Sequence, residues 1–222
     1  MNRNRARSLA AAALVLVSGC TSSPTTVPST LVYTALGASD AVGIGAFPPT
    51  LGYVCLIAER LRGARPKVEF HNLGINGAKA DEFIAQELPD AVASNPDIVT
   101  LWTGENDLIA GRTPDQFAAH LDEILRRLRS ETHAQVFVAD LVDISRAPLF
   151  RNFPDPDVTS ARVAAFNQRI YAGVAAHGAV LVKISAQSID DSLFSIDGFH
   201  PSNKGHELLA QGFWAEIEPR LP

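Results

Sequence analysis

The chain has 222 residues, of which 46% are hydrophobic and 19% are charged, and this length and composition suit one domain with a full apolar core. Its mean hydropathy is close to zero, at +0.07, and its composition argues against both a disordered chain and a polytopic membrane protein. Lys and Arg number 19 against 24 Asp and Glu, a net charge of −5. We therefore expect no basic surface and no nucleic-acid partner.

The first twenty residues have the pattern of a secretory signal. A positive region made of Arg3, Arg5 and Arg7 precedes an apolar stretch over residues 10–17 that is too short to span a bilayer. Small residues then lead into Cys20, an ending that resembles a bacterial lipobox, in which cleavage leaves the cysteine to be acylated. The resemblance implies a lipoprotein signal peptide over residues 1–19 and lipid attachment at Cys20. An ordinary signal peptide and a short helix that ends in Cys are the alternatives.

Residues 20–30 are rich in Ser, Thr and Pro, which is the composition of a flexible tether. Cleavage after residue 19 removes three arginines and no acid, so 16 basic and 24 acidic residues remain, a net charge of −8. Anionic headgroups repel such a domain, and we expect it to be held outside the cytoplasm by the lipid anchor. The other cysteine, Cys55, has apolar neighbours that predict a core position on a helix.

From residue 31 onward, short apolar runs alternate with longer amphipathic segments. Five runs predict strands that are buried on both faces: Leu31–Leu36, Lys67–Asn72, Ile98–Trp102, Gln135–Leu141 and Val180–Ile184. Apolar residues at helical spacing predict helices around Phe117 to Leu128, Val163 to Val174 and Leu208 to Ile217. The first of these has a start signal made of Thr113, Pro114 and Gln116. The alternation predicts one α/β domain over residues 31–222, with three α/β/α layers and a five-stranded, mostly parallel sheet.

Polar and glycine-rich sequences follow four of these elements, and chemistry in such sheets lies at the carboxyl ends of the strands. They are Gly37–Gly43 with Ser39 after the first strand, Gly74–Gly77 after the second, Gly104–Asp107 after the third, and Asp197–Pro201 after the fifth. Each sequence alone is typical of a turn, a helix cap or a backbone position with positive φ. Only their combination points to a reaction.

Together the four sequences contain the groups that acyl transfer to a serine needs. Ser39 lies at a tight strand-to-helix turn, where its hydroxyl is a candidate nucleophile. The Asp-x-x-His spacing allows the carboxylate of Asp197 to bind Nδ1 of His200, so that Nε2 faces the serine. A glycine N–H and a side-chain amide would stabilise the oxyanion, together with the N–H of the nucleophile.

These four blocks, in this order, resemble the SGNH hydrolases, also called GDSL esterases and lipases, over nearly all of residues 31–222. The most specific blocks are Gly-Glu-Asn-Asp at 104–107 and Asp-Gly-Phe-His-Pro at 197–201. The resemblance implies a flavodoxin-like sheet and no cofactor. The site residues that it implies are the nucleophile Ser39, the base His200 with its orienting acid Asp197, and the oxyanion donors Asn106 and Gly77. Gly74 is the alternative to Gly77 as the backbone donor.

One position departs from the family's pattern. The family usually has Asp directly before the serine, whereas this chain has Ala38 there and Asp40 directly after Ser39. That Asp is not the carboxylate of the triad, so the chemistry is expected to survive. The hydrogen bonding of the loop, and with it the pH optimum, is expected to differ.

The remaining residues predict no metal or cofactor site, because no His, Cys, Asp and Glu cluster has ligand spacing. The histidines without a setting like that of His200 are His71, His120, His133, His177 and His206. Trp102 is predicted in the core and Trp214 on the last helix. The sequence predicts a long loop over Asp143–Asp157. The loop is expected to line an acyl pocket or contact an anionic headgroup, and the alternative is that it only covers the sheet edge.

The sequence therefore predicts a serine esterase that hydrolyses carboxylic esters through an acyl-enzyme intermediate. Two substrate classes stay open: lipid or short acyl esters, and O-acetyl groups on cell-envelope polysaccharide. The alternative from another class is a non-catalytic surface lipoprotein that binds glycan, because a fold alone does not decide function. The expected partners are a small-molecule or glycan ester and the membrane that holds Cys20.

Overall fold

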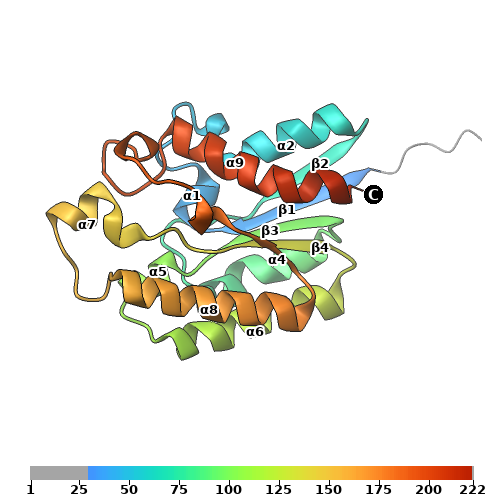
Figure 1. Cartoon of the computed structure of the whole chain (residues 1–222). Coiled ribbons are helices and arrows are strands. Elements are labelled where there is room, and N and C mark those ends of the chain that lie inside the picture. The colour runs from blue at the N-terminus through green and yellow to red at the C-terminus, as the bar shows by residue number, and fades with distance from the viewer. Residues whose placement is uncertain (1–29, 222) are drawn as a thin grey trace, which may run out of the picture.

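The structure, a computed structural model, describes residues 30–221 and has three α/β/α layers (Figure 1). Five strands form one sheet in the order β2-β1-β3-β4-β5, and every neighbouring pair is parallel. The strands are β1 (Leu31–Gly37), β2 (Val68–Asn72), β3 (Ile98–Trp102), β4 (Gln135–Ala139) and β5 (Val180–Val182). The predicted fold class is confirmed. The predicted signal peptide, Cys20 and tether residues 21–29 lie outside the described residues.

Helices cover both faces of this sheet (Figure 1). On one face lie α2 (Tyr53–Ala64) and α9 (Asn203–Ile217), and on the other α4 (Leu88–Ala93), α6 (Pro114–Glu131) and α8 (Ser160–His177). Four short helices are α1 (Ser39–Val42), α3 (Ala80–Glu82), α5 (Glu105–Ile109) and α7 (Pro148–Asn152). Single 3₁₀ turns are η1 (Pro49–Leu51), η3 (Ile144–Arg146), η4 (Ile184–Ala186), η5 (Asp191–Leu193) and η6 (Glu218–Arg220), and η2 (Phe83–Glu87) is a π-helical turn. The three predicted helices correspond to α6, α8 and α9.

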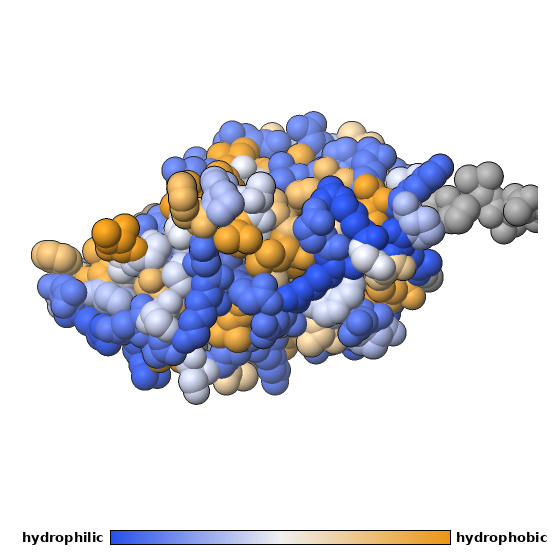
Figure 2. All heavy atoms as spheres, turned by 90° about the horizontal axis from the view of Figure 1, so that it is seen from above, coloured by the Kyte–Doolittle hydropathy of each residue, from blue (hydrophilic) through white to orange (hydrophobic). Residues whose placement is uncertain are grey.

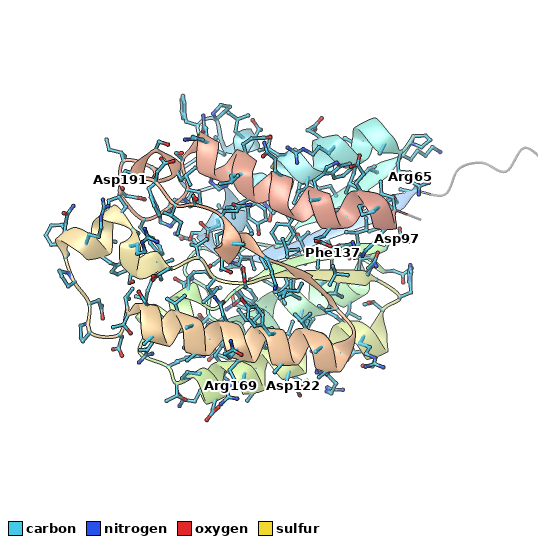
Figure 3. The ribbon with its side chains drawn as sticks, viewed as in Figure 1. Arg65, Asp97, Asp122, Phe137, Arg169 and Asp191 are labelled. Carbon is cyan, nitrogen blue, oxygen red and sulfur yellow. The ribbon has the colours of Figure 1, made fainter. Side chains whose placement is uncertain are left out.

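The core lies between the sheet and its helix layers. Phe137 of β4 is fully buried there (Figure 3), and Phe117 of α6 stacks on Phe166 of α8 with ring centroids 4.9 Å apart. The predicted start of α6 is confirmed, because Thr113 Oγ1 accepts the Gln116 N–H at 3.2 Å while Gln116 Oε1 accepts the Thr113 N–H at 2.9 Å. Local sequence signals and burial therefore agree along this helix.

Two strands end earlier than predicted. The side chain of Asn167, on α8, hydrogen-bonds both backbone groups of Leu141 at 2.7 and 2.9 Å, so that residue leaves the ladder of β4. Ile184 begins the turn η4 and does not continue β5. Cys55 lies on α2 as predicted, but it is half-buried and packs against the edge of the core, not inside it. Trp102 is buried and Trp214 lies on α9, as predicted.

All five strands point their carboxyl ends toward the same end of the molecule, where α1, α5 and α7 lie (Figure 1). β1 starts at the opposite end. No helix within residues 30–221 is long and apolar enough to cross a membrane. The loops at the carboxyl ends therefore form the part of the fold in which a site is expected.

Candidate active site

Ser39 is the first residue of α1 and follows the carboxyl end of β1 directly. Its side chain lies in a buried position, with 4% of the residue exposed. α1 is a single turn that ends at Gly43 in the left-handed region, φ 90°. The Ser39 carbonyl accepts backbone N–H groups from Gly43 and Ile44 at 3.1 and 2.9 Å. Ser39 is thus held by a tight strand-to-helix turn, as predicted for a nucleophile.

Asp197 and His200 form a hydrogen-bonded pair in the loop before α9. Asp197 Oδ2 lies 2.6 Å from His200 Nδ1, and Asp197 Oδ1 accepts hydrogen bonds from the Ser195 hydroxyl and from the N–H groups of Phe199 and His200 at 2.8–2.9 Å. Burial alone would raise the pKa of Asp197, but these four hydrogen bonds lower it to about 2. Ionised Asp197 accepts the Nδ1 proton of His200, so in the neutral ring the lone pair lies on Nε2.

Within the described residues, His200 forms no direct hydrogen bond to the hydroxyl of Ser39. The two residues nevertheless come from segments in contact: a Cβ built on Gly45, six residues after Ser39, would lie 3.1 Å from Cβ of His200 and 2.2 Å from the carbonyl oxygen of Pro201. A catalytic hydrogen bond that is absent without substrate often forms in the complex. The missing bond therefore does not favour the non-catalytic alternative.

Two side chains of α9 tie its first turns to the loop between α1 and α2. The Asn203 amide donates to the Phe47 carbonyl at 2.9 Å and accepts the Phe47 N–H at 2.7 Å. The fully buried His206 donates from Nε2 to the Ile44 carbonyl at 3.0 Å and accepts the Tyr53 N–H on Nδ1 at 3.2 Å. Burial lowers the pKa of His206, in keeping with the neutral ring that these bonds require.

The sequence predicts no role for His206, which lies among the apolar residues Leu209, Phe213 and Ile217 of α9. A buried imidazole needs hydrogen-bond partners, so a histidine within an apolar helix face indicates a polar contact with another part of the chain. The structure places those partners in the segment that follows Ser39. Of the other histidines, His71, His133 and His177 hydrogen-bond to Glu69, Asp97 and Asp122 respectively, away from the site.

Gly77 lies in the turn from Ile75 to Ala78, closed by the Ala78 N–H donating to the Ile75 carbonyl at 3.1 Å. Its φ of +76° lies in the left-handed region, and no described atom lies within 4 Å of where its Cβ would be. Among residues 30–221 the Gly77 N–H has no acceptor. The Gly74 N–H, in contrast, donates to Asn72 Oδ1 at 3.1 Å, so Gly77 is the better-placed donor of the two.

Asn106 lies on α5, after the carboxyl end of β3. Its side-chain amide donates to the Ala78 carbonyl at 3.0 Å, which orients the group toward the Gly77 turn and leaves a second N–H for a ligand. Its neighbour Asp107 is fully buried and accepts the Ala80 N–H at 2.9 Å and Arg112 Nη1 at 3.1 Å. Asp107 therefore anchors α5 to α3 and does not face the site.

The segment Asp143–Asp157 is not the irregular loop that was predicted, because it contains η3 and α7. It supports the Asp197–His200 turn: the Leu149 N–H donates to the Gly198 carbonyl at 2.9 Å, and the ring of Phe150 packs edge-on against Phe199 at 5.7 Å. Arg151 also pairs with Asp191 at 2.7 Å, and Figure 3 shows Asp191 in the loop above α7. Of this segment, Ile144 lines an apolar cavity beneath the turn.

Large hydrophobic side chains are exposed around the same end of the molecule. Within the described residues these are Val42, Ile44, Phe47, Phe153 and Ile196. All five lie in α1 or in connections at the carboxyl ends of the strands, and Phe47 is 85% exposed. Figure 2 shows hydrophobic surface among hydrophilic side chains at this left end. We call these five residues the apolar rim.

Residues 30–221 contain no group of three or more His, Cys, Asp and Glu side chains that could hold a metal ion. The glycine turns carry no phosphate-loop sequence. The groups that this end of the sheet brings together are a hydroxyl, an imidazole oriented by a carboxylate, and hydrogen-bond donors.

Solved structures with the same fold support this assignment of architecture. TesA superposes with a TM-score of 0.71 at 22% sequence identity, covering 86% of this chain and 99% of TesA. Axe2, an acetylxylan esterase from Geobacillus stearothermophilus, gives a TM-score of 0.69 at 20% identity, covering 84% and 94%. A two-domain esterase (CEX) active on acetylated mannans gives 0.67 at 19%, covering 86% of this chain and 49% of that one. No curated protein sequence matches this chain.

The sequence pattern of one family matches residues 33–208, which spans the chain from β1 into α9. That range includes all four blocks, from the Ser39 turn to the Asp197–His200 turn. The family is described as the GDSL-like Lipase/Acylhydrolase family. Its match over most of the chain, on the fold that such esterases share, shows that this chain is a member of the GDSL-like Lipase/Acylhydrolase family, a hydrolase that acts on esters.

Proposed function

We propose that this protein is a serine esterase that works through an acyl-enzyme intermediate formed on Ser39. One observation carries the proposal. His200 Nδ1 is held by Asp197 at 2.6 Å, and Nε2 is left as a base at the end of the sheet where Ser39 begins α1.

In this mechanism, Nε2 of His200 takes the hydroxyl proton as Ser39 Oγ attacks the ester carbonyl. The negative oxygen accepts hydrogen bonds from the N–H groups of Ser39 and Gly77 and from the Asn106 amide. His200 then returns the proton to the leaving alcohol. Water repeats the sequence, releasing the acid and restoring Ser39.

The test is hydrolysis of p-nitrophenyl acetate, butyrate and decanoate by the purified full-length chain and by Ser39→Ala. Ser130→Ala, which changes an exposed serine on α6, is the matched control. We expect Ser39→Ala to lose turnover by at least about 10³-fold and Ser130→Ala to keep it. Full activity in Ser39→Ala would contradict the proposal. Inactivity of the folded wild type toward every ester would favour the glycan-binding alternative.

Two substrate classes follow from different observations. The apolar rim favours esters with an apolar acyl group, since exposed apolar surface marks sites that bind apolar partners. The structural similarity to esterases of acetylated xylan and mannan favours O-acetyl groups on polysaccharide. The rate on decanoate relative to acetate, measured beside acetate release from acetylated xylan, separates the two.

We further propose that Cys20 carries lipid and holds the domain at a bacterial membrane, outside the cytoplasm. The sequence of residues 1–20 supports this, with three arginines, a short apolar stretch and small residues before the cysteine. Mass spectrometry of the N-terminal peptide from the membrane fraction should show diacylglyceryl on Cys20. Cys20→Ser should leave the protein without lipid, and unmodified Cys20 in the wild type would reject the proposal.

A further inference from the structure

Asp40 and Glu105 occupy equivalent places on two neighbouring strands. β1 and β3 are parallel partners, and their register pairs Gly37 with Trp102. Asp40 and Glu105 each come three residues after that pair, in the short helices α1 and α5. Two acidic residues therefore occupy equivalent positions beyond the same edge of the sheet.

Each acid is also the direct neighbour of a proposed oxyanion donor. Asp40 follows Ser39, whose N–H is one donor, and Glu105 precedes Asn106, whose amide is another. An interaction between Asp40 and Glu105 would set the spacing of these two donors. No hydrogen bond between the backbones of α1 and α5 does so in the described residues.

Asp40 and Glu105 line the same apolar cavity. Its other walls are mostly hydrophobic and come from Trp102, Val142, Ile144, Leu193, Phe194, Phe199, Leu208 and Leu209. Glu105 is buried, with 7% of the residue exposed, and its Oε1 has no hydrogen-bond partner among the described residues. No Lys or Arg of residues 30–221 lines the cavity, so its wall contains no permanently positive side chain to offset two ionised carboxylates.

The charged groups around the pair are mostly acidic. The charges of Asp107 and Asp140 raise the pKa of Glu105. The charges of Asp40, Glu105 and Glu87 raise the pKa of the buried Tyr53 hydroxyl. In the Asp197–His200 turn, the charge of His200 lowers the pKa of Asp40 and the charge of Asp197 raises it. Of all these groups, only His200 can be positive.

The two acids of the pair differ in pKa. Burial raises the pKa of Glu105 well above its usual range, and the charge of Asp40 adds to this. Burial raises the pKa of Asp40 to about 6, against the lowering effect of His200. At neutral pH, Glu105 is therefore the acid and Asp40 the carboxylate.

We propose that protonated Glu105 donates a hydrogen bond to the carboxylate of Asp40, and that this bond holds the Ser39 turn at the correct distance from Asn106. Asp40 and Glu105 are then positioning residues for the oxyanion hole. The inference rests on the proposed serine mechanism. It also gives a role to the acid that this chain has after its serine, where the family usually has an acid before it.

The bond depends on one proton, which gives it a pH signature. When Glu105 loses the proton, two carboxylates face each other in an apolar cavity and repel. The oxyanion donors then separate, and kcat falls on the alkaline side. A glutamine at position 105 donates an N–H in place of the acid and does not titrate, so it should keep the bond without the alkaline fall.

The experiment measures kcat and KM for p-nitrophenyl butyrate across pH with the full-length chain, its Glu105→Gln and Glu105→Ala variants, and Glu87→Gln. Glu87 is the matched control, since it is also a buried acid with a raised pKa, but its Oε2 accepts the Gly37 N–H at 3.0 Å. We expect Glu105→Ala to lower kcat about tenfold or more with little change in KM, because small displacements of catalytic groups are costly. Glu105→Gln should retain kcat within about threefold and lose the alkaline limb. Glu87→Gln should keep that limb.

Three outcomes would overturn the inference while leaving the serine mechanism intact. They are an unchanged kcat in Glu105→Ala, an alkaline limb that persists in Glu105→Gln, and a limb that disappears in Glu87→Gln instead. If Glu105→Ala does not fold, the two glutamine variants still decide the matter. Activity that survives in Ser39→Ala is a separate result, and it would overturn the proposed function itself.

Discussion

The Nε2–H of His206 donates to the carbonyl of Ile44 at 3.0 Å and thereby joins α9 to the loop that follows Ser39. The same ring lies nearly parallel to that of Tyr53, at 8° and 6.3 Å, and accepts the Tyr53 N–H. α9 begins three residues after His200, so this contact connects the loop after the proposed nucleophile with the helix after the proposed base.

His206→Phe keeps an aromatic ring in this place but leaves the Ile44 carbonyl and the Tyr53 N–H without their partner. We expect the free energy of unfolding to fall by about 2–4 kcal/mol, since each buried unpaired group costs about 1–3 kcal/mol. Urea denaturation measures this change. His133→Phe is the control, because its side chain is 57% exposed and its loss should cost less than about 1 kcal/mol. Equal effects of the two variants would show that His206 contributes only its ring volume.

Glu87→Gln should change how stability depends on pH. Burial raises the pKa of Glu87 to about 8, from 4.5 in the unfolded chain. The contribution of Glu87 to the free energy of unfolding is thus fully present below pH 4.5 and is lost as the pH rises through about 8, because the buried carboxyl must then ionise. Gln keeps an acceptor for the Gly37 N–H and does not titrate. The variant should therefore become more stable relative to the wild type as the pH rises across this window. Thermal unfolding of both proteins at each pH measures the difference, and a constant difference would contradict the raised pKa.

Gly45→Ala should disturb the contact between the loop after Ser39 and the catalytic loop. Gly45 has φ +90°, and a Cβ there would lie 2.2 Å from the Pro201 carbonyl oxygen. Both the strain and the clash move His200 away from Ser39, so we expect stability to fall by about 2 kcal/mol or more and kcat to fall with it.

Gly63→Ala is the matched control for Gly45→Ala. Gly63 lies inside α2, and nothing lies within 4 Å of its Cβ position. Alanine there should stabilise the helix by about 0.5–1 kcal/mol without changing kcat. If Gly45→Ala behaves like Gly63→Ala in both measurements, the close packing of Gly45 against Pro201 is wrong.

Asn106→Ala tests the proposed oxyanion hole. Loss of one side-chain donor at such a site lowers kcat by about 10²–10³ and leaves KM nearly unchanged. Steady-state kinetics on p-nitrophenyl butyrate measures both constants, with Asn152→Ala at the exposed end of α7 as the control. A rise in KM at constant kcat would assign Asn106 to ground-state binding instead.

Much of this architecture can be predicted from local patterns. The run Ile98–Trp102 has the bounds of β3 to the residue, because a strand buried on both faces is predominantly apolar. Its one polar residue, Thr100, hydrogen-bonds to the Tyr33 hydroxyl inside the core. The Thr113–Gln116 box is equally local, since the groups that bond lie three residues apart. The Asp197–His200 pair belongs to the same class, because a three-residue spacing in a turn brings the carboxylate to the ring.

The positions that the sequence misjudged depend on contacts with distant residues. β4 stops at Ala139 because Asn167, on another helix, takes the backbone groups of Leu141. Cys55 is half-buried because the packing of α2 decides which side of that helix faces outward.

Local patterns along the chain therefore establish the succession of strands and helices, the parallel α/β class and the four blocks that follow the strands. Periodicity, capping and short turns depend on residues that are close in the chain, so they can be predicted without knowing which elements pack against them. The contact of His206 with Ile44 and the equivalent positions of Asp40 and Glu105 become visible only in the folded domain. Those pairs arise from strand order, from the register of β1 on β3 and from the docking of α9. Each is set by burial across the whole domain, which no local pattern contains.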